Sequence, residues 1–159
     1  MGEQNDELAA IFDEIGNSLL YQGENRFRAL AYLRYATTLR SLPEPIGSVA
    51  ERGELESLPG VGKAIAEKTR AYLKEGTFDL YERVNSEVPK GIRALLREGV
   101  PPGLVRELEK LGVRSPDDLK EALAQNRLRP EGFPKGVRRQ FETLTQAALN
   151  GSGSRPGPS

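Results

Sequence analysis

The chain of 159 residues contains no cysteine, no histidine and no tryptophan. Without cysteine, it can form neither a disulfide bond nor a thiolate metal site. Without histidine, it lacks the commonest general base, the commonest zinc ligand and any histidine-containing catalytic triad. We therefore expect no cofactor and no metal ion held by side chains.

Long apolar runs and alternating, strand-like segments are missing as well. No apolar run approaches the roughly 20 residues that a membrane-spanning helix needs. Acidic residues near the start (Glu3, Asp6 and Glu7) argue against a secretory signal peptide. We expect an all-α protein with no membrane partner and no secretion. Its expected location is the cytoplasm, in association with a bacterial nucleoid, or the nucleus if the source is eukaryotic.

Apolar residues recur at helical spacing along most of the chain. The composition, 37% hydrophobic and 29% charged residues, is typical of a soluble globular protein. The spacing of apolar residues and the positions of Gly, Pro and Ser predict a first helix near 5–21 and a second helix that ends before Pro43. Further helices are predicted near 45–51, 62–74, 78–85, 89–98, 102–111, 116–125 and 135–149. The sequence GSGSRPGPS has no apolar residue to bury, which predicts a flexible tail or linker at 151–159.

The most informative motif is LPGVGKAIAEK, at residues 58–68. Its two glycines lie where a tight turn should join two helices, and glycine lets another backbone approach closely. The first N–H groups of the following helix have no intrahelical partner, and the helix dipole favours an anion there. The motif predicts a helix-hairpin-helix that binds a nucleic-acid backbone without reading its sequence. A plain turn between two helices is the simpler alternative.

The same pattern recurs twice downstream. GVPPGLVR at residues 99–106 and GFPKGVRR at 132–139 each begin with Gly and a bulky apolar residue and run into an amphipathic helix. Where the first copy has Gly62, these copies have Pro101 and Pro134, and each proline removes one N–H donor. As phosphate sites, we therefore rank the first hairpin above the second and the second above the third, which could be purely structural.

The formal net charge is zero, which does not favour a nucleic-acid binder. Binding through a few backbone donors and local cations would still be possible, with modest and salt-sensitive affinity. Basic residues are clustered locally, and these clusters could be either contact sites or ordinary solvated faces. They comprise Arg26, Arg28, Arg34 and Arg40; Lys63, Lys68, Arg70 and Lys74; and Arg127, Arg129, Lys135, Arg138 and Arg139.

This set of motifs resembles the N-terminal DNA-binding region of family X DNA polymerases, which include DNA polymerase beta and bacterial relatives. The resemblance covers nearly all of residues 5–150. It depends on GENRFR (23–28) followed by Ala31 and Tyr32, on LPGVGKAIAEK, on GVPPGLVRELEKLGV (99–113) and on EGFPKGVRRQF (131–141). It implies tandem helix-hairpin-helix subdomains, with a lyase-like helical bundle at 1–86 and a smaller unit with degenerate hairpins at 87–150.

The resemblance also implies functions. The family's DNA-binding positions fall on Arg28, Tyr32, Gly60, Val61, Gly62, Lys63, Gly99, Val100, Gly103 and Arg106, and the hairpin carbonyls could hold a monovalent cation. In the family, a lysine removes a 5′-deoxyribose phosphate through a Schiff base. That lysine aligns with Lys68, and an active-site acid aligns with Glu67. The reaction needs an amine of depressed pKa, for which Lys63 and Arg70 are candidate neighbours.

Several positions depart from the family pattern. Glu56, Ala64 and Leu80 stand where the eukaryotic lyase has lysines, and Phe27 stands where it has a histidine. The sequence contains no counterpart of the polymerase palm or of the bacterial phosphoesterase domain, so we expect neither polymerisation nor metal-dependent cleavage. A catalytic domain or partner protein beyond the tail is possible.

Two functions remain open. One is a DNA-binding module for gapped, nicked or 5′-phosphorylated DNA, with or without lyase activity. The other is a helical scaffold that has lost affinity for DNA.

Overall fold

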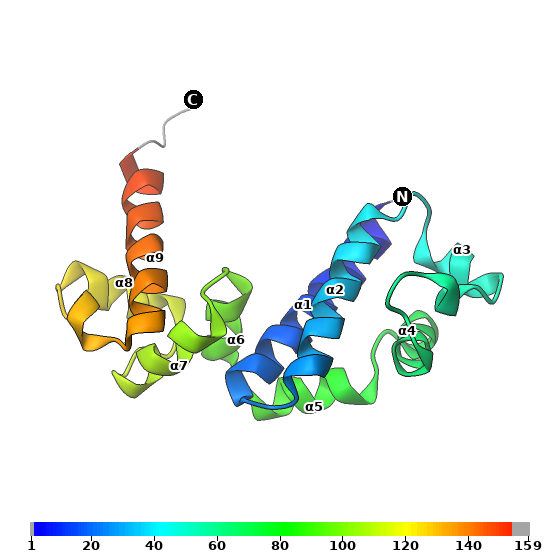
Figure 1. Ribbon diagram of the computed structural model, residues 1–159, viewed down its shortest axis with the longest axis horizontal. Helices are drawn as coiled ribbons and strands as arrows, with labels where there is room; N and C mark the ends of the chain where they lie inside the picture. The colour runs from blue at the N-terminus through cyan, green and yellow to red at the C-terminus, as the bar shows by residue number, and fades with distance from the viewer. Residues whose placement is uncertain (1, 154–159) are drawn as a thin grey trace. The chain divides into compact units, whose positions relative to one another are not determined.

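The computed structural model describes residues 2–153, and side chains up to residue 147. The described residues form helices and no strand, which confirms the predicted all-α class. The chain divides into two compact units, Met1–Pro89 and Lys90–Ser159. The first unit (Figure 1) contains α1 (Gly2–Gln22), α2 (Arg26–Ser41), α3 (Ile46–Glu51), the 3-10 turn η1 (Leu55–Ser57), α4 (Lys63–Glu75) and α5 (Asp79–Glu87). The second contains α6 (Lys90–Arg97), α7 (Pro102–Lys110), α8 (Pro116–Ala124), the 3-10 turn η2 (Pro130–Gly132) and α9 (Lys135–Gly153).

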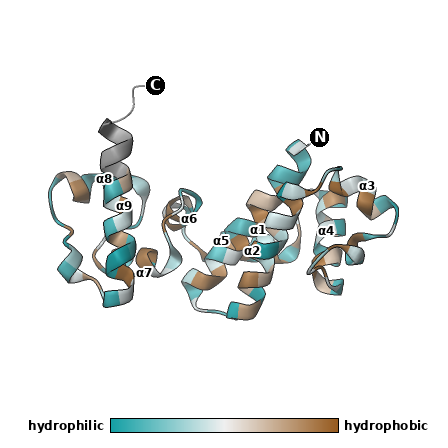
Figure 2. Ribbon diagram, turned by 45° about the horizontal axis from the view of Figure 1, so that its top comes forward, coloured by the Kyte–Doolittle hydropathy of each residue, from teal (hydrophilic) through white to brown (hydrophobic). Residues whose placement is uncertain are grey.

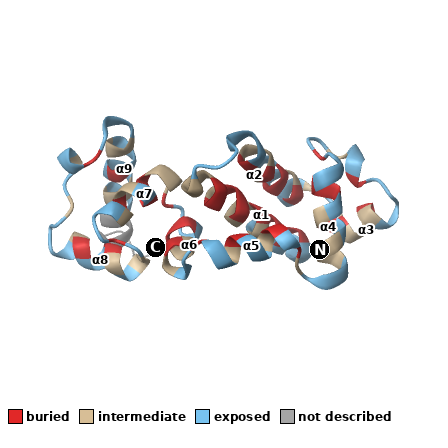
Figure 3. Ribbon diagram, turned by 90° about the horizontal axis from the view of Figure 1, so that it is seen from below, coloured by how far each residue is buried: buried red, intermediate tan, exposed pale blue. Residues whose placement is uncertain are grey.

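Helices α1 and α2 lie antiparallel and form the largest contact of the first unit (Figure 1). Their buried residues lie on the sides that face each other (Figure 3). A Cβ added at Gly16 would lie 2.7 Å from Leu33 Cγ and 2.9 Å from the Ala29 carbonyl oxygen. Glycine at this position therefore allows the two helices to approach closely. The turn between the helices uses Gly23 at φ 75°, and the Asn25 side chain caps α2 by accepting from the Arg28 N–H at 3.1 Å.

An aromatic cluster forms the centre of the first unit. The ring of Phe12 lies 5.7 Å from Tyr32, 4.9 Å from Tyr35 and 5.5 Å from Phe78, measured between centroids. These rings come from α1, α2 and the residue before α5, so the cluster joins three parts of the chain. Such aromatic pairs add to the stabilisation that burial provides.

Helix α4 is attached to this core by a buried hydrogen bond. The Tyr35 and Thr69 hydroxyl oxygens are 2.8 Å apart, and Thr69 donates to the Ile65 carbonyl at 2.9 Å. Because threonine has only one hydroxyl proton, Tyr35 must be the donor to Thr69. Burial raises the pKa of Tyr35 to about 12. The bond therefore fixes the rotation of α4, and with it the faces that carry the predicted site residues.

A second polar anchor positions the start of α3. The buried Asn5 side chain donates to the Glu44 carbonyl at 2.8 Å and accepts from the Ile46 N–H, also at 2.8 Å. It thereby satisfies two backbone groups that burial would otherwise leave unpaired. The anchor joins the beginning of α1 to the segment that leads into the hairpin.

The second unit is a smaller helical cluster in which α6 contacts α7 and α8, and α7 contacts α9. Apolar and polar residues lie on different sides of the helices (Figure 2). A Cβ at Gly91 would clash with the Arg114 carbonyl oxygen, so glycine lets α6 pack directly on the turn before α8. Arg138 donates to the carbonyls of Pro130 and Phe133 at 3.0 and 3.1 Å. This member of the predicted basic cluster therefore holds η2 against α9.

The end of the chain differs in part from the expectation. Helix α9 runs to Gly153, past the predicted start of the tail at 151, and the rest of the predicted tail lies outside the described residues. The division between the units falls at Pro89 and Lys90, while the predicted subdomain limits at 86 and 87 remain a prediction. Among the described residues, no helix combines the length and apolar character that crossing a bilayer requires.

Candidate nucleic-acid interface

The first hairpin is a tight turn. The Val61 N–H donates to the Leu58 carbonyl at 3.1 Å, with Pro59 and Gly60 between them. Gly60 has φ 75°, and a type II turn needs a positive φ at this third position and favours proline at the second. Val61 is buried, which anchors the turn on the core. Gly60 is thus required by the backbone conformation itself.

Gly62 has a different role, because the fold does not require a glycine there. It is the N-cap of α4 in an extended conformation, with φ −98°, and no atom of the described residues lies within 4 Å of a Cβ built on it. The first bond of the helix runs from the Ala66 N–H to the Gly62 carbonyl at 3.0 Å, so the N–H groups of Lys63, Ala64 and Ile65 have no intrahelical acceptor. Within the described part of the chain, no side chain caps this end, and the first turn of α4 contains no acid. An external group can therefore approach these donors.

Helix α8 begins in the opposite way. The Ser115 hydroxyl accepts from the Asp118 N–H at 3.0 Å, and the Asp118 carboxylate accepts from the Arg114 N–H at 3.0 Å. Asp117 and Asp118 also place negative charge at the positive end of the helix. This end has a side-chain cap and a negative charge that would repel a phosphate.

The second predicted hairpin keeps the glycine but loses donors. Gly99 has φ 95° and ends α6, since Gly99 and Val100 donate to the Leu96 and Leu95 carbonyls at 3.0 and 3.2 Å. This is the usual glycine stop of a helix. Helix α7 then begins with Pro101 as N-cap and Pro102 as its first residue, neither of which has an N–H.

Two donors remain at the start of α7, those of Gly103 and Leu104, because the first helical bond runs from Val105 to the Pro101 carbonyl at 2.9 Å. Arg106 is exposed on the same helix.

The third predicted copy does not repeat the turn. Gly132 lies in η2, is absent from the residues of positive φ, and donates to the Arg129 carbonyl at 2.9 Å. A different segment does repeat the first two turns: Gly112 has φ 89° and is followed by the buried Val113. The Gly112-Val113 pair is visible in the sequence and could have predicted this further turn, but we did not identify it there.

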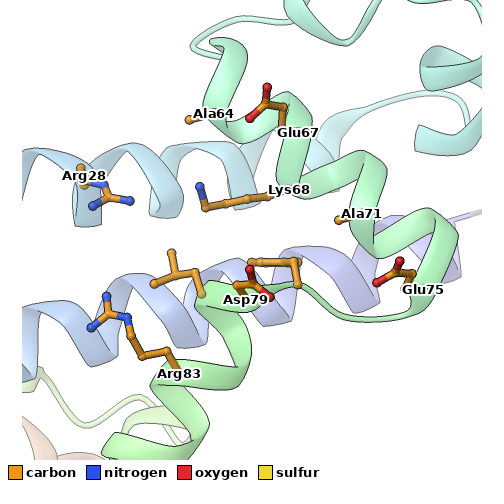
Figure 4. A pocket seen from close by; sticks show the side chains of 10 residues that line it. Arg28, Ala64, Glu67, Lys68, Ala71, Glu75, Asp79 and Arg83 are labelled. Carbon is orange, nitrogen blue, oxygen red and sulfur yellow. The ribbon is translucent and has the colours of Figure 1, made fainter.

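A cleft opens beside α4 in the first unit, with a volume of about 550 Å³. Arg28 from α2, Lys68 from α4 and Arg83 from α5 direct their charged ends toward the same side of it (Figure 4). Ala71, Phe78 and Leu80 contribute apolar lining, and the acids of the lining are Glu67, Glu75 and Asp79.

Tyr32 connects the cations of the cleft to the core. Its ring is buried against Phe12, and the Arg28 guanidinium carbon and the Lys68 Nζ each lie 5.9 Å from the ring centroid. Arg28 Nη2 also donates to the Tyr32 hydroxyl at 3.0 Å. Cations at this distance from an aromatic face are attracted by it. The ring therefore holds two positive charges at one place without neutralising them.

The structure gathers Arg28, Tyr32, Glu67 and Lys68 at this cleft, and Ala64 joins it to the hairpin that contains Gly60, Val61, Gly62 and Lys63. Gly99, Val100, Gly103 and Arg106 belong to the second unit. The described lining includes neither Lys63 nor Arg70, and Arg70 lies 3.7 Å from the Glu56 carboxylate. The sequence analysis did not single out Arg83, whose proximity to the cleft depends on how α5 folds back.

The structure also shows where the other residues lie that differ from the pattern of family X polymerases. Ala64 and Leu80 line the cleft, while Phe27 is 85% exposed at the start of α2. Among the described residues, no group of three or more acidic side chains is arranged to hold a metal ion. A monovalent cation at the hairpin carbonyls stays a prediction.

Comparison with known proteins agrees with the geometry of the first unit. Residues 3–78 match the family described as "Helix-hairpin-helix domain". The chain is also 28% identical over 152 residues, 94% of its length, to "DNA polymerase/3'-5' exonuclease PolX" of Bacillus subtilis (strain 168). It spans 26% of that protein, about a quarter of its length. The match over residues 3–78 and this similarity confirm the predicted resemblance of the chain to the N-terminal region of family X DNA polymerases.

Proposed function

We propose that the chain is a sequence-independent, structure-selective DNA-binding module of the repair type, which holds gapped, nicked or 5′-phosphorylated DNA by its backbone. The helix-hairpin-helix domain and the similarity to a DNA polymerase support binding to DNA. The observation that carries the proposal is the open start of α4, where Gly62 has free space around it and three N–H groups lack an intrahelical acceptor.

These donors suit a phosphodiester oxygen. A phosphate gains hydrogen bonds from the backbone and a favourable interaction with the helix dipole, and no base edge takes part. Lys63, exposed at the first position of α4, adds a positive charge beside them. Binding should therefore depend little on base sequence.

The cleft supports a preference for phosphorylated ends. A terminal phosphate monoester carries about 1.5 to 2 negative charges near neutral pH, by analogy with phosphorylated side chains, whereas each internal phosphodiester carries one. Three cations from three different helices surround one side of the cleft. The arrangement favours the more highly charged group, which a gap with a 5′-phosphate exposes and an intact duplex does not.

Fluorescence anisotropy tests the proposal with three labelled DNAs. They are gapped DNA with a 5′-phosphate, intact duplex of the same sequence, and gapped 5′-phosphorylated DNA of an unrelated sequence. Gapped DNA with a 5′-phosphate should bind more tightly than intact duplex, with similar affinity for unrelated base sequences. Affinity should fall steeply between about 50 and 200 mM salt, because phosphate contacts release counterions. Failure to bind gapped DNA at micromolar protein and low salt would contradict the proposal.

A second candidate function, 5′-deoxyribose-phosphate lyase activity, is favoured by the position of Lys68. Its amine lies in the cleft beside Tyr32 and Arg28, where a bound 5′-phosphate would bring the sugar close. In such a reaction, the neutral amine adds to the C1′ aldehyde of the opened sugar, and uptake of one proton with loss of water forms an iminium ion. Loss of a C2′ proton to a base such as Glu67 then breaks the C3′–O bond and releases the DNA strand with its 5′-phosphate.

Borohydride trapping tests this activity directly. Reduction of the iminium ion should join the protein covalently to DNA that carries a 5′-deoxyribose phosphate. Lys68→Ala should remove most of the adduct while largely preserving DNA binding, and Lys63→Ala is the matched lysine control on the same helix. If wild-type protein forms no more adduct than Lys68→Ala, the chain binds DNA without lyase activity.

A helical scaffold without DNA affinity is the alternative function. The zero net charge and the two prolines at the start of α7 favour it. The salt titration distinguishes the two functions, because a scaffold would bind none of the three DNAs even at low ionic strength.

A further inference from the structure

We propose that Arg83 of α5 is the residue that discriminates a terminal 5′-phosphate from an unphosphorylated 5′ end. In this proposal, Glu87 positions the Arg83 guanidinium, and the Glu24 carboxylate competes with the phosphate for it. This inference deepens the proposed function and depends on it. Arg83 lines the cleft and extends toward the side where Arg28 and Lys68 end (Figure 4).

The hydrogen bonds of Arg83 leave part of its guanidinium available. Nη1 donates to the Glu87 carboxylate, with the nearer oxygen at 3.2 Å, one turn further along α5. Nη2 lies 3.8 Å from the Glu24 carboxylate, beyond hydrogen-bond distance. Of the three nitrogens of the Arg83 guanidinium, Nη1 is the one with a hydrogen-bond acceptor among the described residues. The Nη2 and Nε donors can therefore turn to a ligand without breaking the bond to Glu87.

Glu87 is itself held in place. Its Oε1 also accepts from the Gln22 side chain, at 3.0 Å, near the end of α1. Gln22 and Glu24 both lie at the connection between α1 and α2, and α2 carries Arg28. The network thus ties α5 to the end of α1 and to the connection that leads into α2.

The balance of charges explains why a phosphate could displace Glu24. The Arg83 and Glu24 side chains are each 43% exposed, and ion pairs this exposed contribute little. A phosphate monoester instead offers several acceptor oxygens and up to two charges, which a guanidinium binds in a bidentate manner. Arg28 and Lys68 add to the attraction for the same group.

The experiment compares two gapped DNAs that differ only in a 5′-phosphate or a 5′-hydroxyl, and its readout is the ratio of their dissociation constants. We expect wild-type protein to prefer the phosphate by about tenfold, and Arg83→Gln to reduce the ratio to about twofold, as the loss of a charge-assisted contact predicts. Arg83→Lys should fall between them, because it keeps the charge and loses the planar fork. Glu24→Gln should raise the ratio about twofold by removing the competing carboxylate.

Arg34→Gln is the matched control, since Arg34 is an exposed arginine of α2 that is not among the described lining residues. It should change both affinities alike and leave the ratio unaltered. A wild-type ratio in Arg83→Gln, with normal folding, would overturn the inference and leave the proposed function intact. Wild-type protein that binds both gapped DNAs equally would overturn the inference and the proposed preference for phosphorylated ends, while the proposed binding to gapped DNA would stand. Absence of binding to either DNA would overturn the proposed function and this inference together.

Discussion

The first and second hairpins have the same Gly-Val pair, but the residues that follow this pair differ. In both, a glycine of positive φ precedes a buried valine, and an α-helix begins two residues after the valine. After Val61 comes Gly62, which leaves the helix start open, whereas after Val100 come Pro101 and Pro102, which remove two of the donors. The comparison separates two requirements that the motif combines. The Gly-Val pair makes the turn, and the residues after it decide whether the turn can bind an anion.

Helix α8 extends the same lesson. It too follows a glycine of positive φ and a buried valine, Gly112 and Val113, but Ser115 caps it by accepting from the Asp118 N–H, and its first turn contains two acids. Three similar turns thus lead to three helix starts with different capacity for a phosphate.

Gly62→Val should produce the largest change. A valine side chain would block the approach to the α4 donors, and affinity for gapped DNA should fall about thirtyfold, the equivalent of about 2 kcal/mol lost from hydrogen bonds to a charged group. Stability should change by less than about 0.5 kcal/mol, because the backbone is extended there and no atom crowds the new side chain. Anisotropy titration and urea unfolding measure the two effects.

Pro134→Val is the control for this substitution, since it places valine before α9 in the third copy. It should leave affinity nearly unchanged. Equal effects of the two substitutions would mean that the first hairpin is only a connector.

Alkaline pH should weaken the first unit selectively. Because burial raises the pKa of Tyr35 to about 12, the stabilisation from its neutral form is complete below pH 10 and is lost as the pH rises through 12. At pH 11 the loss should be about 1.4 kcal/mol. Urea unfolding followed by circular dichroism at pH 8 and pH 11 measures it.

Tyr35→Phe supplies the comparison. It should remove most of this pH dependence at a constant cost of about 1 kcal/mol for the lost hydrogen bond, while Thr69 keeps its bond to the Ile65 carbonyl. The sequence of the second unit has no tyrosine, so its unfolding transition is an internal reference. An unchanged pH dependence in the variant would contradict the role given to Tyr35.

Gly60→Ala and Gly99→Ala should each destabilise their own unit by about 1 kcal/mol, because alanine is strained at a positive φ. Only Gly60→Ala should also reduce DNA affinity. Tyrosine fluorescence reports unfolding of the first unit alone, since all five tyrosines lie there, at positions 21, 32, 35, 72 and 81. If Gly99→Ala weakened binding as much as Gly60→Ala does, the two hairpins would contribute equally.

The smallest expected effect is a gain. Replacing Pro101 and Pro102 by Gly and Lys copies the first hairpin into the second and restores two N–H donors. Affinity for gapped DNA should rise about threefold, since a typical net hydrogen bond contributes about 0.5–1.5 kcal/mol and ordering the glycine offsets part of it. Unchanged affinity would mean that the second unit contacts no phosphate at α7.

The features that sequence reasoning predicted are those with local causes. Helical periodicity and the Leu58–Lys68 motif led to the all-α class and to the helix-hairpin-helix, because turn chemistry and helix starts depend on residues a few positions apart. The same local signals misplaced the third copy, where Gly132 precedes a helix but lies in a 3-10 turn. They also could not show that Arg138 would hold a loop against α9.

The amino-acid sequence by itself determined the helices, the glycine turn and the open start of α4, since each follows from backbone sterics and missing caps within one short segment. The tertiary structure alone decided which charges meet. Arg28, Lys68 and Arg83 are far apart along the chain, and the packing of α2, α4 and α5 around Phe12, Tyr32 and Phe78 brings them to one cleft. The physical reason is that the hydrophobic effect depends on the apolar area that is buried and not on the separation of the rings along the chain. Only the folded core therefore determines which surface residues become neighbours.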